Sequence, residues 1–215
     1  MSFRVRSVRI TYTDSLGKQN PETQFAFFIE DADDMAKRNN LENIATGNIR
    51  LSRLNAATSS LYSVFQHMIG NLDWTSAVGP DPAVCCHNSK LIGGRDSDSP
   101  YYPVPYDFDA SGLVDTHYSV APRYLGVQVI TDRLYQGFCF HNHLTEASLD
   151  IFRTKKDAIL AVFRDDPRLD ESHKDIALRY LDKFFTLINT QGSSEKEFNR
   201  NCRDQPAYVI ANPDV

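Results

Sequence analysis

Apolar and polar residues alternate along the first part of the chain, as they do in β-strands. Residues 3–12 and 23–30 are rich in β-branched and aromatic side chains, and a polar turn around Gly17 separates them. This pattern predicts an antiparallel hairpin with one buried face. The alternation shifts by one position near Ser7 and Val8, which predicts a β-bulge there.

Helical spacing dominates much of the remaining sequence. Residues 31–40 place carboxylates first and basic side chains last, as the dipole of a short helix favours. Residues 50–69 carry apolar side chains three and four positions apart and precede Gly70, which indicates a core helix with a glycine end. Two more amphipathic helices are predicted at about 145–163 and 170–189, the second capped by Asp170. The predicted buried positions are Leu54, Ala57, Leu61, Val64, Phe65 and Met68 in the core helix and Leu178, Leu181, Phe185 and Ile188 in the last one.

Between these helices, residues 70–121 form a loop-rich segment that holds five of the ten prolines. Short strands are predicted within it at residues 89–92 and 101–108, and residues 191–215 are predicted to be packed coil that frays near Pro213. The expected fold is therefore a single α+β domain, residues 1–215, in which a short antiparallel hairpin precedes a mainly helical body. Loops held by such a scaffold are where function concentrates.

Composition narrows the classes of protein. With 215 residues, 41% of them hydrophobic and 24% charged, the chain can bury one core and shows no sign of disorder. Its net charge of -5 and the lack of a basic run longer than Lys155-Lys156 argue against nucleic acid as a partner. No apolar run reaches the roughly 18 residues of a membrane span, and no signal peptide is visible. The default expectation for location is the cytoplasm.

The cysteines leave alternatives open. Cys85 and Cys86 are adjacent, and no Cys-x-x-Cys spacing occurs. Cys139, His141 and His143 alternate, so on a strand they would share a face and could bind zinc, although no fourth ligand is evident. If the protein is exported, a disulfide between Cys139 and Cys202 is possible instead.

Four polar residues of the loop-rich segment are candidates for chemistry. Asp107 and Asp109 are two apart at the end of a predicted strand, so their side chains are expected on one face. Paired carboxylates repel unless a cation lies between them, and Mg²⁺ or Mn²⁺ completed by phosphate oxygens suits such a pair. Asp73 follows the core helix closely, and Asn88 offers an amide oxygen to a metal. Alternatively, Asp107 and Asp109 are solvated or cap the turn before Ser111, Asp73 caps the turn after Gly70, and Asn88 forms an Asx turn.

The order of these features resembles the C-terminal lobe of atypical kinase-like proteins, namely the CotH-type spore-coat kinases and the HipA-type toxin kinases. The resemblance rests on Gly-Asn-Leu-Asp73 after a helix, His87-Asn88 before a strand, and Pro-Tyr-Asp107-Phe-Asp109 after the next strand, and it covers roughly residues 3–108. It implies that Asp73 is the catalytic aspartate, that Asn88 and Asp107 bind the metal, and that Asp109 is an auxiliary ligand. His87 would be their neighbour. The implied cofactor is Mg²⁺ or Mn²⁺ with ATP, and the implied partner is a protein that offers a hydroxyl.

Two features depart from the kinase pattern. An extra loop, residues 75–86, separates Asp73 from Asn88, whereas kinases place the catalytic Asp and Asn about five residues apart. If residues 1–30 resemble the end of a kinase N-lobe and residues 31–215 the C-lobe, no residues correspond to the phosphate-covering loop, the ATP-pairing Lys or its Glu. No G-x-G-x-x-G is present. The expectation is a pseudokinase or a truncated kinase, whose hairpin edge can drive self-association.

Two other functions remain as alternatives. The first is a non-enzymatic binding or scaffold domain with a vestigial acidic pocket. The second is a metal-dependent hydrolase that uses Asp73, Asp107 and Asp109, with a nucleophile near Ser111. No Gly-x-Ser-x-Gly or His-Glu-x-x-His motif supports the hydrolase.

Overall fold

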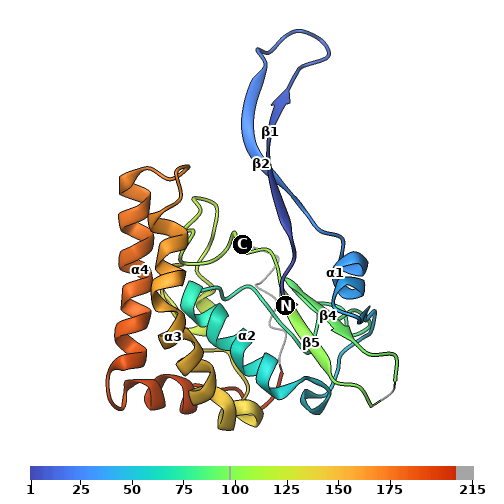
Figure 1. Ribbon diagram of the computed structural model, residues 1–215, viewed down its shortest axis with the longest axis vertical. Helices are drawn as coiled ribbons and strands as arrows, with labels where there is room; N and C mark the ends of the chain where they lie inside the picture. Colours follow the sequence, from blue (N-terminus) through green and yellow to red (C-terminus); the bar gives the residue numbers. More distant parts are fainter. Residues whose placement is uncertain (97, 207–215) are drawn as a thin grey trace.

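The computed structural model describes residues 1–96 and 98–206. A long two-stranded hairpin projects from a body made of helices and a small three-stranded sheet (Figure 1). The predicted α+β class is therefore confirmed, and so is the order of hairpin first and helical body second.

The hairpin consists of β1 (Val5–Tyr12) and β2 (Glu22–Ile29). Their antiparallel pairing runs without interruption from Val5 opposite Ile29 to Tyr12 opposite Glu22, so the predicted bulge is wrong. The predicted buried face is also wrong, because Phe25 is 66% exposed and most other strand residues are exposed as well. Alternation predicts burial only where a second layer exists, and none of the described elements covers these strands.

A short helix and the small sheet lie at the base of the hairpin. Helix α1 (Ala32–Arg38) is capped by Asp31, whose carboxylate accepts from the Asp33 backbone N–H at 2.8 Å. Strands β3 (Glu42–Asn43), β4 (Ser89–Gly93) and β5 (Tyr101–Pro105) pair antiparallel in that order. Strand β5 ends before the predicted limit of residue 108, and this shortening determines the geometry of the candidate site. The residues buried between α1 and the sheet are Met35, Ala36, Ile92 and Val104.

Helix α2 (Ala56–Ile69) starts later than residues 50–69 predict. A separate 3₁₀ turn, η1 (Leu51–Arg53), comes first, and the Asn55 side chain then accepts from the Thr58 N–H at 3.0 Å, which caps α2. Gly70 ends the helix as predicted, with a left-handed backbone at φ 65°. Of the predicted buried positions, Ala57 is exposed, because the first turns of the helix bury Ser59 and Ser60 instead.

Helices α3 (Thr145–Arg164) and α4 (Glu171–Asn189) lie side by side and carry the main core (Figure 1). Asp170 caps α4 as predicted, accepting from the His173 N–H at 2.9 Å. The Ser60 and Ser148 hydroxyls are hydrogen-bonded at 2.9 Å, so the buried polar contact between α2 and α3 is satisfied. The buried residues shared by the three helices include Val64, Met68, Leu149, Phe152, Leu181, Phe184, Phe185 and Ile188.

Short helical turns lie in the segments that connect and follow the long helices. They are two 3₁₀ helices, η2 (Arg123–Leu125) and η3 (Cys139–Leu144), and a π-helix, η4 (Glu195–Asn199), which interrupts the coil predicted from residue 191. Cys139 forms a disulfide with Cys202, as one of the two alternatives anticipated. The zinc alternative is wrong, because the Cys139 sulfur is committed and His141 and His143 lie on a 3₁₀ helix rather than a strand. Residues 207–215, which include Pro213, lie outside the described part.

Candidate functional site

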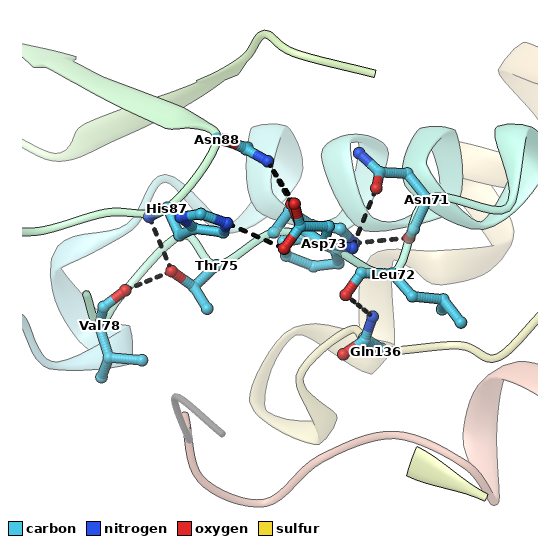
Figure 2. A network of polar contacts seen from close by, with 9 residues as sticks. Asn71, Leu72, Asp73, Thr75, Val78, His87, Asn88 and Gln136 are labelled. Carbon is cyan, nitrogen blue, oxygen red and sulfur yellow. Dashed lines mark hydrogen bonds and ion pairs between the residues drawn. The ribbon is translucent and has the colours of Figure 1, made fainter. Parts of the chain in front are cut away.

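Asp73 lies on a tight turn directly after α2. The Asn71 side-chain oxygen accepts from the Asp73 N–H at 3.0 Å (Figure 2). The Asn71 carbonyl accepts from the Trp74 indole N–H, also at 3.0 Å. Trp74 is buried against Tyr62, with ring centroids 4.9 Å apart. Buried neighbours therefore hold the backbone on both sides, while the Asp73 side chain keeps about half of its surface exposed, at 51%.

Asn88 lies just past residues 75–86, the inserted loop, and connects the end of this loop to Asp73. Its side-chain nitrogen donates to the Asp73 carbonyl at 2.7 Å and to the Asp73 Oδ2 at 3.0 Å. Asn88 is buried and has a left-handed backbone at φ 49°, a conformation that asparagine tolerates better than most residues. Since the amide nitrogen is committed to Asp73, the amide oxygen remains the group with which Asn88 can bind a cation.

His87 contacts the same carboxylate from the other side. Its Nε2 lies 2.8 Å from the Asp73 Oδ1, so the two oxygens of Asp73 have separate partners (Figure 2). The hydrogen bond with Asp73 raises the pKa of His87, and partial burial opposes this effect. The sequence predicted only that His87 would be a neighbour of the site residues. The position of His87 next to Asn88 in the sequence indicated that His87 lies near the site. It did not predict the direct contact between His87 and Asp73.

Asp107 and Asp109 lie on the turn that follows β5. Asp107 has a left-handed backbone at φ 59°, so the extended geometry used to predict their shared face is wrong. The turn nevertheless keeps them in contact. Burial, followed by the negative charge of Asp109, raises the pKa of Asp107, and Asp73 adds to the shift. Tyr118 donates its hydroxyl proton to the Asp109 Oδ2 at 3.0 Å, a contact that sequence reasoning missed.

The four predicted site residues therefore belong to one region of the molecule. The Tyr106 N–H donates to the Asn88 carbonyl at 3.2 Å, which places the aspartate turn beside Asn88. Within residues 1–96 and 98–206, no three His, Cys, Asp or Glu side chains are grouped as a metal site requires. A cation here would depend on the Asn88 oxygen, on Asp107 with Asp109, and on ligands from outside the protein. Burial makes the largest contribution to the raised pKa of Asp107, and the neighbouring charge of Asp109, which a bound cation would offset, adds to it.

The inserted loop is fastened to the body rather than projecting from it. The Ile49 N–H donates to the Ala77 carbonyl at 2.8 Å, and the Cys85 N–H donates to the Thr46 carbonyl at 2.8 Å. Cys85 and Cys86 are bonded to each other. The adjacency of these cysteines in the sequence does not predict the bond, because spacing alone does not distinguish two thiols from a disulfide.

Comparisons with protein-family models, with curated proteins and with solved structures found no match for this chain. Among the described helices, none combines the length and the apolar character needed to cross a bilayer.

Proposed function

We propose that this chain carries the catalytic-loop region of an atypical kinase-like protein. The chemistry of the intact form would be phosphoryl transfer from a metal nucleotide to a hydroxyl, with Asp73 orienting the hydroxyl and Asn88 and Asp107 holding Mg²⁺ or Mn²⁺. Asp109 would be an auxiliary ligand. The acceptor class that fits is a protein hydroxyl.

The convergence of these residues is the observation that carries the proposal. Asp73 and Asn88 are joined by two hydrogen bonds across the inserted loop. Asp107, from a third segment, directly follows Tyr106, whose N–H donates to the Asn88 carbonyl at 3.2 Å. After burial and Asp109, the charge of Asp73 makes a smaller contribution to the raised pKa of Asp107. If each residue only stabilised its own local turn, these contacts between segments would not be needed. The order of helix, Asp, Asn, strand, strand and Asp also resembles the kinase arrangement, apart from the extra loop between Asp73 and Asn88.

The bonds that would form and break in such a transfer follow from the chemistry of phosphoryl transfer. The acceptor hydroxyl oxygen attacks the γ-phosphorus, the bond from that phosphorus to the diphosphate bridging oxygen breaks, and the hydroxyl proton passes to Asp73. The metal would neutralise charge on the phosphate oxygens. We expect the chain alone to transfer phosphate weakly or not at all, since no Lys and helix Glu matching the phosphate-pairing pair of kinases can be assigned in the sequence.

Thermal unfolding with and without nucleotide tests this proposal. Mn²⁺ with ATP at ten times its dissociation constant should stabilise the fold by about 1.4 kcal/mol, which raises Tm by roughly 3–5 °C for a chain of this size. The shift should vanish with chelator and in Asp107→Asn and Asn88→Ala, each compared with its own ligand-free Tm. Asp115→Asn, at another exposed left-handed aspartate, should keep the full shift.

A scaffold domain with a vestigial acidic pocket is the second candidate. The exposed apolar residues of the β1–β2 hairpin favour it, because they offer a surface for a protein partner, including a second copy of this chain. The net charge of -5 makes nucleic acid an unsuitable partner. A wild-type chain that shows no nucleotide-dependent shift would support this candidate and contradict the kinase-like one.

A further inference from the structure

We propose that His87 is a positioning residue that fixes the carboxylate of Asp73, and that the inserted loop places it there. The inference deepens the proposed function, since the role assigned to Asp73 rests on that function. The contact between the two side chains does not depend on it. The resemblance to kinases names no histidine for this task.

The hydrogen-bonding capacity of the two groups determines the direction of the bond. An ionised carboxylate only accepts, so the His87 Nε2, at 2.8 Å from Oδ1, must carry the proton. Asn88 donates to the other oxygen, Oδ2, at 3.0 Å. The terminal torsion of an aspartate is otherwise broad. Two donors on opposite oxygens restrict this torsion, so the plane of the Asp73 carboxylate is held before any substrate arrives.

His87 is itself held by Thr75. The Thr75 N–H donates to the His87 carbonyl at 3.0 Å, and the Thr75 hydroxyl accepts from the His87 N–H at 2.9 Å. The same hydroxyl donates to the Val78 carbonyl (Figure 2). The two ends of the inserted loop are therefore hydrogen-bonded to each other. Thr75, at its start, fixes the backbone of His87, which follows its end.

The intervening loop is rigidly attached at several positions. The Asn48 N–H donates to the Pro82 carbonyl at 2.9 Å, and the Asn48 side-chain oxygen accepts from the Gly79 N–H at 3.0 Å. Two further backbone bonds, from residues 49 and 85, join the loop to the same neighbouring segment. These bonds fix residues 77–85 of the loop against residues 46–49. The effect of the loop is to deliver His87 to a carboxylate on its far side.

Nuclear magnetic resonance on the full ¹⁵N-labelled chain tests the proposal without requiring activity. The side-chain amide protons of Asn88 report on the Asp73 carboxylate, because both groups share a hydrogen bond. In the wild type these protons should be separated in shift and slow to exchange, and His87 should be protonated on Nε2. In His87→Ala the signal of the Asn88 amide proton that faces Oδ2 should move toward the position of a free amide, while the proton bonded to the Asp73 backbone carbonyl should keep its shift.

Three further variants separate positioning from packing. His87→Gln should recover at least half of the Asn88 shift, because its amide can donate to Oδ1. Thr75→Val should lose part of the shift, because it removes the hydroxyl that holds the His87 backbone. His173→Ala is the matched control, since His173 pairs with Asp170 at 2.8 Å on the exposed start of α4. It should leave the Asn88 signals unchanged.

Several results would overturn the proposal. They are Asn88 signals unaffected by His87→Ala, a His87 ring protonated on Nδ1 alone, or no recovery in His87→Gln. Calorimetry of Mg²⁺·ATP binding to the wild-type chain separates this question from the proposed function. Absent binding would contradict the kinase-like function, while the Asn88 signals would still decide whether His87 positions Asp73.

Discussion

At the scale of single residues, two histidines have pKa values that are shifted in opposite directions by their surroundings. His87 lies at the surface beside a carboxylate, and that hydrogen bond raises its pKa. His67 lies inside α2 and is 2% exposed. Burial, with a smaller contribution from the positive charge of Arg133, lowers the pKa of His67 to about 3. Glu197 is 3.7 Å away, too far for a hydrogen bond, and burial raises its own pKa, so it does not rescue the charged form of His67.

His67 makes the fold sensitive to acid. Its folded-state pKa of about 3 is below the unfolded value of about 6.5, so the unfolded chain takes up the proton first as the pH falls. The contribution of neutral His67 to the free energy of unfolding is complete well above pH 6.5 and is lost as the pH falls toward 3. At pH 5 the loss amounts to about 2 kcal/mol. Urea unfolding at pH 7 and pH 5 measures it, and His67→Gln should show a smaller loss.

The exposed His173 provides the control for this measurement. His173→Gln should keep the acid loss attributed to His67, because His173 lies at the surface. An equal loss of stability between pH 7 and pH 5 in the wild type and in His67→Gln would contradict the assignment.

At the scale of elements, the end of α2 connects the two halves of the candidate site. The Gly112 N–H donates to the Gly70 carbonyl at 3.0 Å, and the Leu113 N–H donates to the Ile69 carbonyl at 3.0 Å. These bonds join the helix end, which leads to Asp73, to the segment that follows Asp109. The glycine at the joint has a left-handed backbone and lies against the Tyr180 hydroxyl.

Gly70→Ala should therefore be strongly destabilising. The left-handed backbone costs an alanine about 1–2 kcal/mol, and its methyl group would overlap the Tyr180 hydroxyl. We expect a total loss of about 2–4 kcal/mol in unfolding free energy. Gly192→Ala is the control, since Gly192 also has positive φ, at 77°, but no atom lies within 4 Å of the added carbon. It should lose only the backbone part. Equal losses in the two variants would show that the Tyr180 contact adjusts freely.

At the scale of the whole molecule, the hairpin stands apart from the core. Its base is held by an ion pair between Arg38 and Glu30 at 2.7 Å, and an Arg168 nitrogen reaches Ser7 at 3.0 Å. Its large apolar residues remain exposed, with Phe27 at 65% and Phe28 at 66%. A two-stranded ribbon is marginal in water and leaves backbone groups unpaired at its edges.

We therefore expect the chain to self-associate through the hairpin. Light scattering should show a mass that rises with concentration, and a chain beginning near Asp31 should remain monomeric. A less disruptive variant replaces Phe25 and Phe27 together with lysine, which should also give a monomer. Val162→Lys is the control, because Val162 is similarly exposed, at 65%, but lies on α3. A wild-type chain that stays a monomer at all concentrations, or a Val162→Lys variant that loses association as well, would contradict this expectation.

The sequence by itself determined the elements and their local ends. The 3.6-residue spacing predicted α2, α3 and α4, because a helix that covers a core must repeat its apolar face. Caps are equally local, so Asp170 and Gly70 were identified from their immediate neighbours. The positions of Asp73 after a helix and of Asn88 before a strand were also predicted, since both depend on adjacent residues alone.

Only the tertiary structure decided which segments meet. It showed that the hairpin is uncovered, that β5 ends before Asp107, and that His87 bonds to Asp73 across the inserted loop. Alternation along a strand carries no information about whether another layer covers it, and one left-handed residue changes the direction of every side chain after it. Contacts between distant segments depend on how the whole chain packs, so local patterns predicted the site residues but not the bonds between them.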